Sequence, residues 1–369
     1  MARRSSFSAS SATSALTRAY QRNLQAFTQA AIGNGRRIAR QVTKKVADAA
    51  AEQRKPPPGP GDWISGIAMG PGGTRGYHLY RPPGLQLAFG EKLPLMVMLH
   101  GCGQTGREFA TSTRMNRLAA RERFLVLYPE QDRLHHPQGC WNWYDTRSGN
   151  ADREAATLMA AIDQVCLLYA VDRARVAVAG LSAGAGMAAL LATRQPGRFA
   201  AVVMHSGVAP GAAQSTATAI SAMHGRRAAS IPTTAVGKAI GAAAQGAVLP
   251  PLLVLHGDAD HVVAASNAHS AAMVWAAATA ARPSPERLVR RGQRHPMRVT
   301  DFKRGRRVHV TLCQIERLDH AWSGGLKSVA FSDPAGPDAT RLVWAFVEKQ
   351  FAYAAPGAAT PVRRGVDPS

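Results

Sequence analysis

Short apolar runs, separated by turn residues and by Ala- and Arg-rich stretches, constrain the fold of this chain more than any other feature. Several of the runs lack polar alternation, which is typical of strands buried on both faces of a parallel sheet. The runs span residues 76–80, 95–99, 124–128, 176–179, 201–204, 252–255 and 308–315. Because helical stretches lie between them, we expect an α/β fold with a doubly wound, mostly parallel sheet.

Composition divides the chain into four parts. Residues 56–61, Pro-Pro-Pro-Gly-Pro-Gly, form a stiff, helix-breaking linker. Residues 62–352 are the expected α/β domain, and an Ala-, Gly-, Ser- and Thr-rich insertion at residues 207–250 lies where such folds carry a cap or lid. Residues 353–369 are expected to be a disordered tail. Residues 1–55 are expected to be a basic helical arm, because apolar side chains recur there at helical spacing: Leu16, Tyr20, Leu24, Phe27 and Ala31.

The formal net charge of +22 is concentrated in two segments. Residues 1–55 hold 11 Lys and Arg against 2 Asp and Glu, and residues 282–310 hold 10 against 2. Such extensions favour solubility or contact with an anionic surface, for example a granule, through residues 1–55. Specific nucleic-acid binding is not expected, because no basic motif interleaved with aromatic residues is present. The 46% apolar content excludes wholesale disorder, and no run reaches the ~18 apolar residues of a membrane-spanning helix.

The most informative motif is Gly180-Leu-Ser182-Ala-Gly184, which directly follows an apolar run and precedes a helical stretch. Glycines on both sides of a serine allow a sharp strand-to-helix turn that exposes the hydroxyl at the edge of the sheet. The pattern predicts Ser182 as a nucleophile. A glycine-rich turn without catalytic function is the alternative.

A serine nucleophile needs a base held by a carboxylate, and the downstream sequence supplies both. His320 follows the last strand on a loop and is the expected general base. Two acids, Asp258 and Asp260, follow the run 252–255, and either could be the orienting carboxylate. The order Ser, Asp, His along the chain is one of the orders known for such triads.

The loop after the run 95–99, His100-Gly-Cys-Gly-Gln-Thr-Gly106, lies where a second oxyanion donor is expected. We assign the backbone amides of Cys102 and Ala183 to the oxyanion hole. The same loop also matches a dinucleotide-binding fingerprint through Gly101, Gly103 and Gly106, with Glu130 at the end of the next strand. A nicotinamide-dependent oxidoreductase is therefore an alternative of another class, although it leaves the serine, acid and histidine motifs without a role.

Six motifs together resemble the polyhydroxybutyrate depolymerase family of esterases over residues 62–352. They are Leu99-His-Gly-Cys-Gly-Gln104, Gly139-Cys-Trp-Asn-Trp143, Gly180-Leu-Ser-Ala-Gly184, His205-Ser-Gly207, Asp319-His-Ala-Trp-Ser-Gly-Gly325 and Ser332-Asp-Pro-Ala-Gly-Pro-Asp338. The resemblance implies an α/β-hydrolase fold and a serine esterase with the triad Ser182, Asp260 and His320. It also suggests a disulfide between Cys102 and Cys140.

The same resemblance implies an ester substrate, a short-chain polyhydroxyalkanoate polymer or oligomer. Feruloyl and acetylxylan esterases are close relatives of the family and give the alternative substrates. We expect the substrate pocket to be lined by Gln104, Trp141, Trp143 and Trp322. For Trp141 and Trp143, simple packing in the core is an equal alternative.

No cofactor is expected, because no Cys/His cluster has metal-binding spacing and no phosphate-binding Gly-rich Lys-Ser/Thr motif is present. The family resemblance and the disulfide imply an extracellular protein. No signal peptide is visible in the sequence, which leaves a cytoplasmic location as the alternative. A further alternative is a non-catalytic hydrolase-like protein whose basic arm binds a granule, a membrane or nucleic acid.

Overall fold

The structure, a computed structural model, describes residues 55–226, 232–244 and 247–354. The chain divides into two compact units, residues 1–55 and 56–369, and the described residues belong to the second unit apart from Lys55. The predicted arm, apart from Lys55, and residues 355–369 of the predicted tail therefore lie outside the described residues. Tyr353 and Ala354, expected to begin the tail, belong instead to the last helix.

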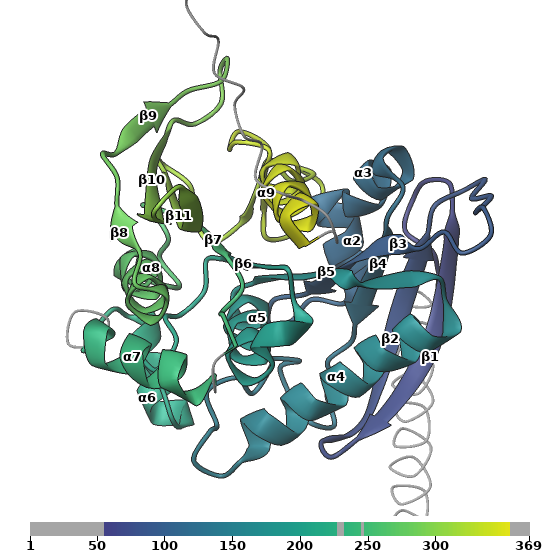
Figure 1. Ribbon diagram of the computed structural model, residues 1–369, viewed down its shortest axis with the longest axis horizontal. Coiled ribbons are helices and arrows are strands. Elements are labelled where there is room, and N and C mark those ends of the chain that lie inside the picture. Colours follow the sequence, from purple (N-terminus) through teal and green to yellow (C-terminus); the bar gives the residue numbers. More distant parts are fainter. Residues whose placement is uncertain (1–54, 227–231, 245–246, 355–369) are drawn as a thin grey trace, which may run out of the picture. The chain divides into compact units, whose positions relative to one another are not determined.

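Strands and helices alternate along the α/β domain (Figure 1). The strands are β1 (Asp62–Gly70), β2 (Gly73–Arg81), β3 (Leu93–Leu99), β4 (Leu125–Pro129), β5 (Val171–Leu181), β6 (Ala201–His205), β7 (Leu252–Gly257), β8 (Arg282–Pro283), β9 (Arg287–Val289), β10 (Met297–Arg304), β11 (Arg307–Ile315), β12 (Trp322–Ser323) and β13 (Ser332–Asp333). The helices are α2 (Gly106–Thr113), α3 (Met115–Glu122), α4 (Asn150–Leu168), α5 (Ala183–Arg194), α6 (Thr216–Met223), α7 (Thr233–Ala243), α8 (Ser266–Thr279) and α9 (Ala339–Ala354), with a 3₁₀ turn η1 (Pro196–Arg198).

The large sheet has the strand order β1-β2-β4-β3-β5-β6-β7-β11-β10-β8, with β9 also paired to β10. Strands β4, β3, β5, β6, β7 and β11 run parallel, while β1, β2, β8, β9 and β10 extend the two ends with antiparallel pairs. The carboxyl ends of the parallel strands therefore meet at one edge. The predicted doubly wound, mostly parallel sheet is confirmed.

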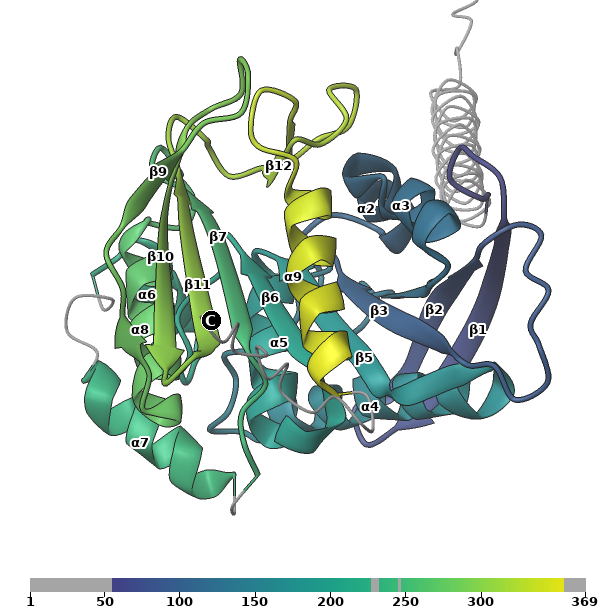
Figure 2. The same cartoon turned by 45° about the horizontal axis from the view of Figure 1, so that its top comes forward.

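Helices cover both faces of the sheet, which explains why its central strands are apolar throughout (Figure 2). In β3, Leu95, Val97 and Leu99 pack into the layer that includes α4, α5 and α8, whereas Met96 and Met98 pack into the layer of α2, α3 and α9. This division follows the alternation of side chains along a strand. Among the described residues, no helix combines the length and apolar character needed to cross a membrane.

The insertion predicted at residues 207–250 contains α6 and α7. Helix α7 packs closely against α8: a Cβ on Gly237 would lie only 2.3 Å from the Val274 carbonyl oxygen. Helix α6 begins with a capping box in which Ser215 and Thr218 exchange side-chain and backbone hydrogen bonds. Its place beside the candidate site is described below.

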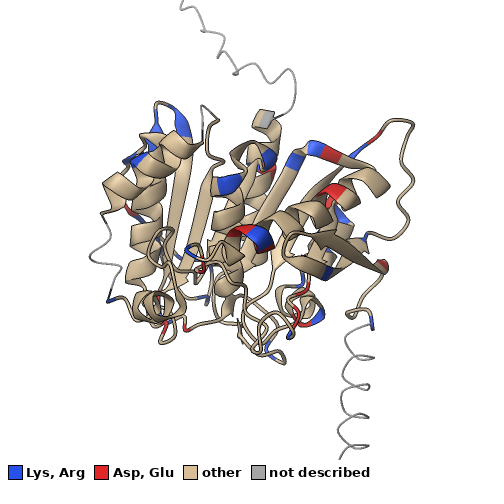
Figure 3. Cartoon of the chain, turned by 90° about the horizontal axis from the view of Figure 1, so that it is seen from below, with Lys and Arg blue, Asp and Glu red and all other residues tan. Residues whose placement is uncertain are grey.

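The basic segment 282–310 forms the antiparallel end of the sheet, including the β10–β11 hairpin. Figure 3 shows Lys and Arg gathered at the turn of this hairpin, far from the edge where the parallel strands end. Arg287 pairs with Asp301 at 2.6 Å, and both Arg304 and Arg306 are exposed. The positive charge of this segment is thus a surface property and does not enter the core.

Helix α5 packs against β3 and β5 at backbone distance through two glycines. A Cβ on Gly184 would lie 2.1 Å from the Leu99 carbonyl oxygen, and one on Gly180 would lie 2.2 Å from the Gly184 backbone. Neither neighbour is a flexible side chain that could turn away. The helix can therefore reach the sheet only if both positions lack a side chain.

We expect Gly184→Ala to lower the free energy of unfolding by about 1–3 kcal/mol, because the added methyl must displace backbone. Gly197→Ala is the matched control, since a Cβ there meets nothing within 4 Å. Denaturant unfolding of both variants checks this expectation. Equal stability of the two would contradict it.

Candidate active site

The turn between β5 and α5 presents Ser182 in a strained conformation. Ser182 has φ 57° and ψ −119°, a region that residues with a side chain rarely adopt. Its N–H donates to the His205 carbonyl at 2.9 Å, which fixes the turn against β6. The segment thus has the strand–turn–helix form predicted from its glycines, with Ser182 at the carboxyl edge of the sheet.

His320 and Asp260, from two different loops, meet at this edge. His320 Nδ1 lies 2.8 Å from Asp260 Oδ2, and both side chains are more than nine-tenths buried. The other carboxylate oxygen accepts the N–H groups of Val262 and Val263 at 2.9 and 2.7 Å. These contacts leave Nε2 of His320 as the ring nitrogen available for chemistry.

Asp258, the alternative acid in the sequence, has other partners. Its carboxylate accepts the Arg317 N–H at 2.7 Å and lies 3.8 Å from the Arg298 guanidinium. Asp260 is therefore the acid that contacts His320.

Asp260 is held in its ionised form by its neighbours. Burial by itself would raise the pKa of this carboxyl, but hydrogen bonds from His256, His320 and the Val263 amide outweigh it. The pKa of Asp260 consequently lies well below its usual range. A negative charge next to Nδ1 favours the tautomer that carries its proton there and would stabilise a charged His320.

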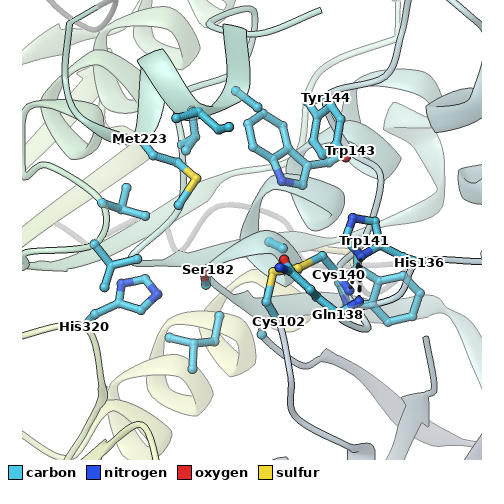
Figure 4. Close-up of a pocket in the computed structure, with 18 of the residues that line it drawn as sticks. Cys102, His136, Gln138, Cys140, Trp141, Trp143, Tyr144, Ser182, Met223 and His320 are labelled. Atoms are coloured by element: carbon cyan, nitrogen blue, oxygen red, sulfur yellow. Dashed lines mark hydrogen bonds between the residues drawn. A yellow bond between two sulfur atoms is a disulfide. The ribbon is translucent and has the colours of Figure 1, made fainter. Parts of the chain in front are cut away.

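Ser182 and His320 face the same cavity of about 380 Å³ (Figure 4). No hydrogen bond joins the two side chains within the described residues. This is common in structures without substrate, where such contacts are often long. The remaining lining is mostly apolar, and its larger side chains are Trp141, Trp143, Tyr144, Leu181, Val208, Ile220, Met223, Val262, Val263 and Phe331.

Two backbone amides beside Ser182 have no hydrogen-bond acceptor in the part of the chain that the structure describes. In the loop after β3, the N–H of Gly101 donates to Gln104 Oε1 and that of Gly103 to the Gln138 carbonyl. The N–H groups of Cys102 and Ala183 make no such bond. Because protein backbone donors are rarely left unused, these two amides are suited to bind an oxygen of a ligand.

A disulfide joins Cys102 to Cys140, with an S–S distance of 2.11 Å. It links the loop after β3 to the segment that carries Trp141 and Trp143. The Trp141 indole N–H donates to the His100 carbonyl at 2.9 Å, which ties the same two segments together a second time.

Of the four residues that we expected to line the pocket, three do so and one does not. Gln104, Trp141 and Trp143 line the cavity, although Trp141 is also fully buried and so combines both predicted roles. Trp322 is not among the lining residues. Its indole stacks on His205 and donates to Thr340, which places it in the core behind the site.

Helix α6 supplies a wall of the cavity that sequence reasoning did not assign to it. Thr216, Ala219, Ile220 and Met223 line the pocket from this helix. These are ordinary helix and core residue types, so no local signal distinguishes them. Only the position of the insertion after β6, where a cap or lid was expected, indicated that this segment lies near the pocket.

The loop that matches a dinucleotide fingerprint is unsuited to a phosphate. The Gly106 N–H, at the start of α2, donates to Glu130 Oε1 at 2.7 Å. The same end of α2 carries a capping box between Thr105 and Glu108. The amides that would bind a pyrophosphate are therefore occupied, and two carboxylates lie beside them. Within the described ranges, no three His, Cys, Asp or Glu side chains are grouped to hold a metal ion.

The fold and this arrangement define an α/β-hydrolase. An acetyl xylan esterase from Aspergillus awamori has a similar structure, with a TM-score of 0.59 and 19% identity over 71% of this chain and 94% of that one. The profile of the Esterase PHB depolymerase family matches residues 75–278, and the chain belongs to this family.

Two curated relatives illustrate the range of the family. Poly(3-hydroxyalkanoate) depolymerase C of Paucimonas lemoignei is 31% identical over 183 residues, which are 47% of this chain and 42% of that protein. Acetylxylan esterase A of Talaromyces purpureogenus is 26% identical over 259 residues, 68% of this chain and 63% of that protein. The chain therefore spans less than two thirds of the length of either relative.

Cys166 and Cys313 are free thiols, in contrast to Cys102 and Cys140. We expect alkylation of the denatured, unreduced protein to label two thiols, and four after reduction. Intact mass measures this directly. Labelling of all four without reductant would show that the Cys102–Cys140 bond is absent.

Proposed function

We propose that this protein is a serine esterase in which Ser182, His320 and Asp260 form the catalytic triad. The observation that carries the proposal is the 2.8 Å contact between His320 and Asp260 in the cavity that also exposes Ser182. Membership of an esterase family supports it. The two unused amides of Cys102 and Ala183 complete the set of groups that acyl transfer requires.

In the proposed mechanism, Ser182 Oγ attacks the ester carbonyl carbon while its proton passes to His320 Nε2. The carbonyl oxygen becomes an oxyanion that accepts hydrogen bonds from the two amides. Collapse breaks the bond to the alcohol oxygen, which takes the proton from His320 and leaves an acyl-serine. Water then attacks the acyl group, gives its proton to His320, and the carboxylic acid departs as the proton returns to Ser182.

We propose a short-chain polyhydroxyalkanoate, as polymer or oligomer, as the substrate. No Lys, Arg, Asp or Glu is among the described residues that line the cavity, and most of these residues are apolar. A sugar chain would need more hydrogen-bonding partners than this wall offers. The name of the relative from Paucimonas lemoignei agrees with the choice of an aliphatic polyester.

A second groove supports a chain-like substrate. It has a volume of about 420 Å³ and is lined by residues of α5, α7 and the segment 208–214, most of them apolar, with Arg194 as a charged member. Trp143 and Val208 line both this groove and the catalytic cavity. A polyester chain could therefore extend past Trp143. In this proposal the insertion at residues 207–250 acts as the cap, and the basic residues 1–55 contact the anionic surface of a granule.

A feruloyl ester is the second candidate substrate. Trp143 and Tyr144 meet edge to face at 5.6 Å in the cavity wall. Such a pair can pack against an aromatic acyl group.

Ser182→Ala should lower kcat on p-nitrophenyl esters by about 10⁵–10⁶-fold, because without the nucleophile only substrate binding and the oxyanion hole contribute to catalysis. A series of acyl chain lengths, 3-hydroxybutyrate oligomers and feruloyl esters measured in parallel identifies the acyl group. Turnover by Ser182→Ala at the wild-type rate would overturn the proposed function.

Asp260→Asn should lower kcat about 10⁴-fold, because the remaining amide no longer favours the required tautomer of His320 or its charged form. Asp258→Asn removes an equivalent carboxylate that does not reach His320, and should keep kcat within about 2-fold. Steady-state kinetics compares the pair. A larger loss of kcat in Asp258→Asn than in Asp260→Asn would show that Asp260 is not the acid of the triad.

A further inference from the structure

Three histidines at strand ends are buried around the candidate site without entering the mechanism above. His100 follows β3, His205 ends β6 and His256 lies in β7, and all three are at most 1% exposed. Burying an imidazole is costly unless its polar atoms find partners. Each ring contacts at least one backbone group of a loop that carries one part of the site.

We propose that these histidines are positioning residues: His100 aims the oxyanion amide of Cys102, His256 holds the loop of Asp260, and His205 holds the loop of His320. The inference rests on the proposed function, because it assigns each ring to one component of that catalytic site.

His100 fixes the peptide group between Gly101 and Cys102. Its Nδ1 lies 2.8 Å from the Gly101 carbonyl, which also accepts the Gln104 N–H at 3.2 Å. Since a trans peptide directs its N–H opposite to its C=O, pinning the carbonyl on one side aims the Cys102 N–H to the other. Hydrogen bonds to the carbonyl also polarise the amide and strengthen its N–H as a donor.

The other nitrogen of His100 defines its tautomer. Nε2 accepts the backbone N–H of Gln131 at 3.1 Å, so it cannot carry a proton. The ring is therefore neutral with its proton on Nδ1. Burial agrees with this, as it lowers the pKa of His100 to about 4.

His256 acts on the loop of the acid. Its Nε2 lies 2.8 Å from the Val263 carbonyl and 3.4 Å from Asp260 Oδ2. Both oxygens accept only, so Nε2 carries a proton, and Nδ1 has no hydrogen-bond partner among the described residues. The ring thus closes the turn whose amides hold Asp260.

His205 acts on the loop of the base. Its Nε2 accepts the Ser323 N–H at 3.2 Å, three residues beyond His320, and Nδ1 lies 3.1 Å from the Ser206 hydroxyl. The ring also stacks on Trp322. Its proton is therefore on Nδ1, and desolvation is the main cause that lowers its pKa to about 3.

Matched substitutions of His100 test the most specific part of the inference. The side-chain nitrogen of Asn can replace Nδ1, whereas Gln reaches only the position of Nε2. We therefore expect His100→Gln to lower kcat about 10²-fold with KM within about 2-fold, and His100→Asn to lose much less. Affinity for an alkyl boronic acid, whose tetrahedral adduct on Ser182 uses the oxyanion hole, should fall with kcat.

His309→Gln is the control. His309 is also buried, and burial lowers its pKa, but it lies near the start of β11, at the sheet edge opposite the site. This variant should lower the melting temperature without changing kcat or boronate affinity. A folded, disulfide-bonded His100→Gln with wild-type kcat and boronate affinity would overturn the role of His100, as would losses equal to those of His309→Gln.

The tautomers provide a test that needs neither activity nor a variant. Nitrogen-15 NMR of labelled histidine should show a proton on Nδ1 and none on Nε2 in His100 and His205, and a proton on Nε2 in His256. Any other tautomer contradicts the corresponding contact. Absence of ester turnover and boronate binding in wild type would instead overturn the proposed function, and these catalytic roles with it, even if the tautomers are as expected.

Discussion

The site depends on how closely α5 approaches the sheet. Gly184 sits against the Leu99 carbonyl and Gly180 against Gly184, so the chain must reverse within a few residues. Ser182 accepts a positive φ because the elements on both sides of it are fixed by this contact. The same approach brings the amide of Ala183 next to the loop after β3. One backbone contact therefore determines the position of the serine and of the Ala183 amide.

Around this rigid turn, the other groups come from loops at the same sheet edge, and each loop is held by buried hydrogen bonds. The loop after β3 is also linked to the segment of Cys140 and Trp141, by the disulfide of Cys140 and by the indole N–H of Trp141. The buried Glu154 carboxylate accepts hydrogen bonds from the side chains of Arg75 and Gln131 and from the Asn142 N–H. The loops are thus extensions of the core rather than flexible connections, which is what a preorganised site requires.

The parts of this architecture that could be predicted from the sequence are those with a local signature. Buried parallel strands have uniform apolar runs, and the glycines around Ser182 specify its turn. Strand β1 was not predicted, since it is largely exposed at the sheet end and its sequence lacks a clear apolar pattern. The direction of Trp322 could not be predicted either, because it depends on the pairing of β12 with β13. For the same reason, the wall formed by α6 depends on tertiary packing.

The absence of Lys and Arg from the described lining of the cavity bears on the end of the proposed reaction as well as on its beginning. An ester enters as a neutral molecule and suits an apolar wall, but the acid that leaves it ionises at neutral pH. Among the described lining residues there is no Lys or Arg to pair with the new carboxylate. An unpaired anion is poorly solvated in such a place, so it moves to water. In the proposed reaction, the pocket therefore disfavours its own product.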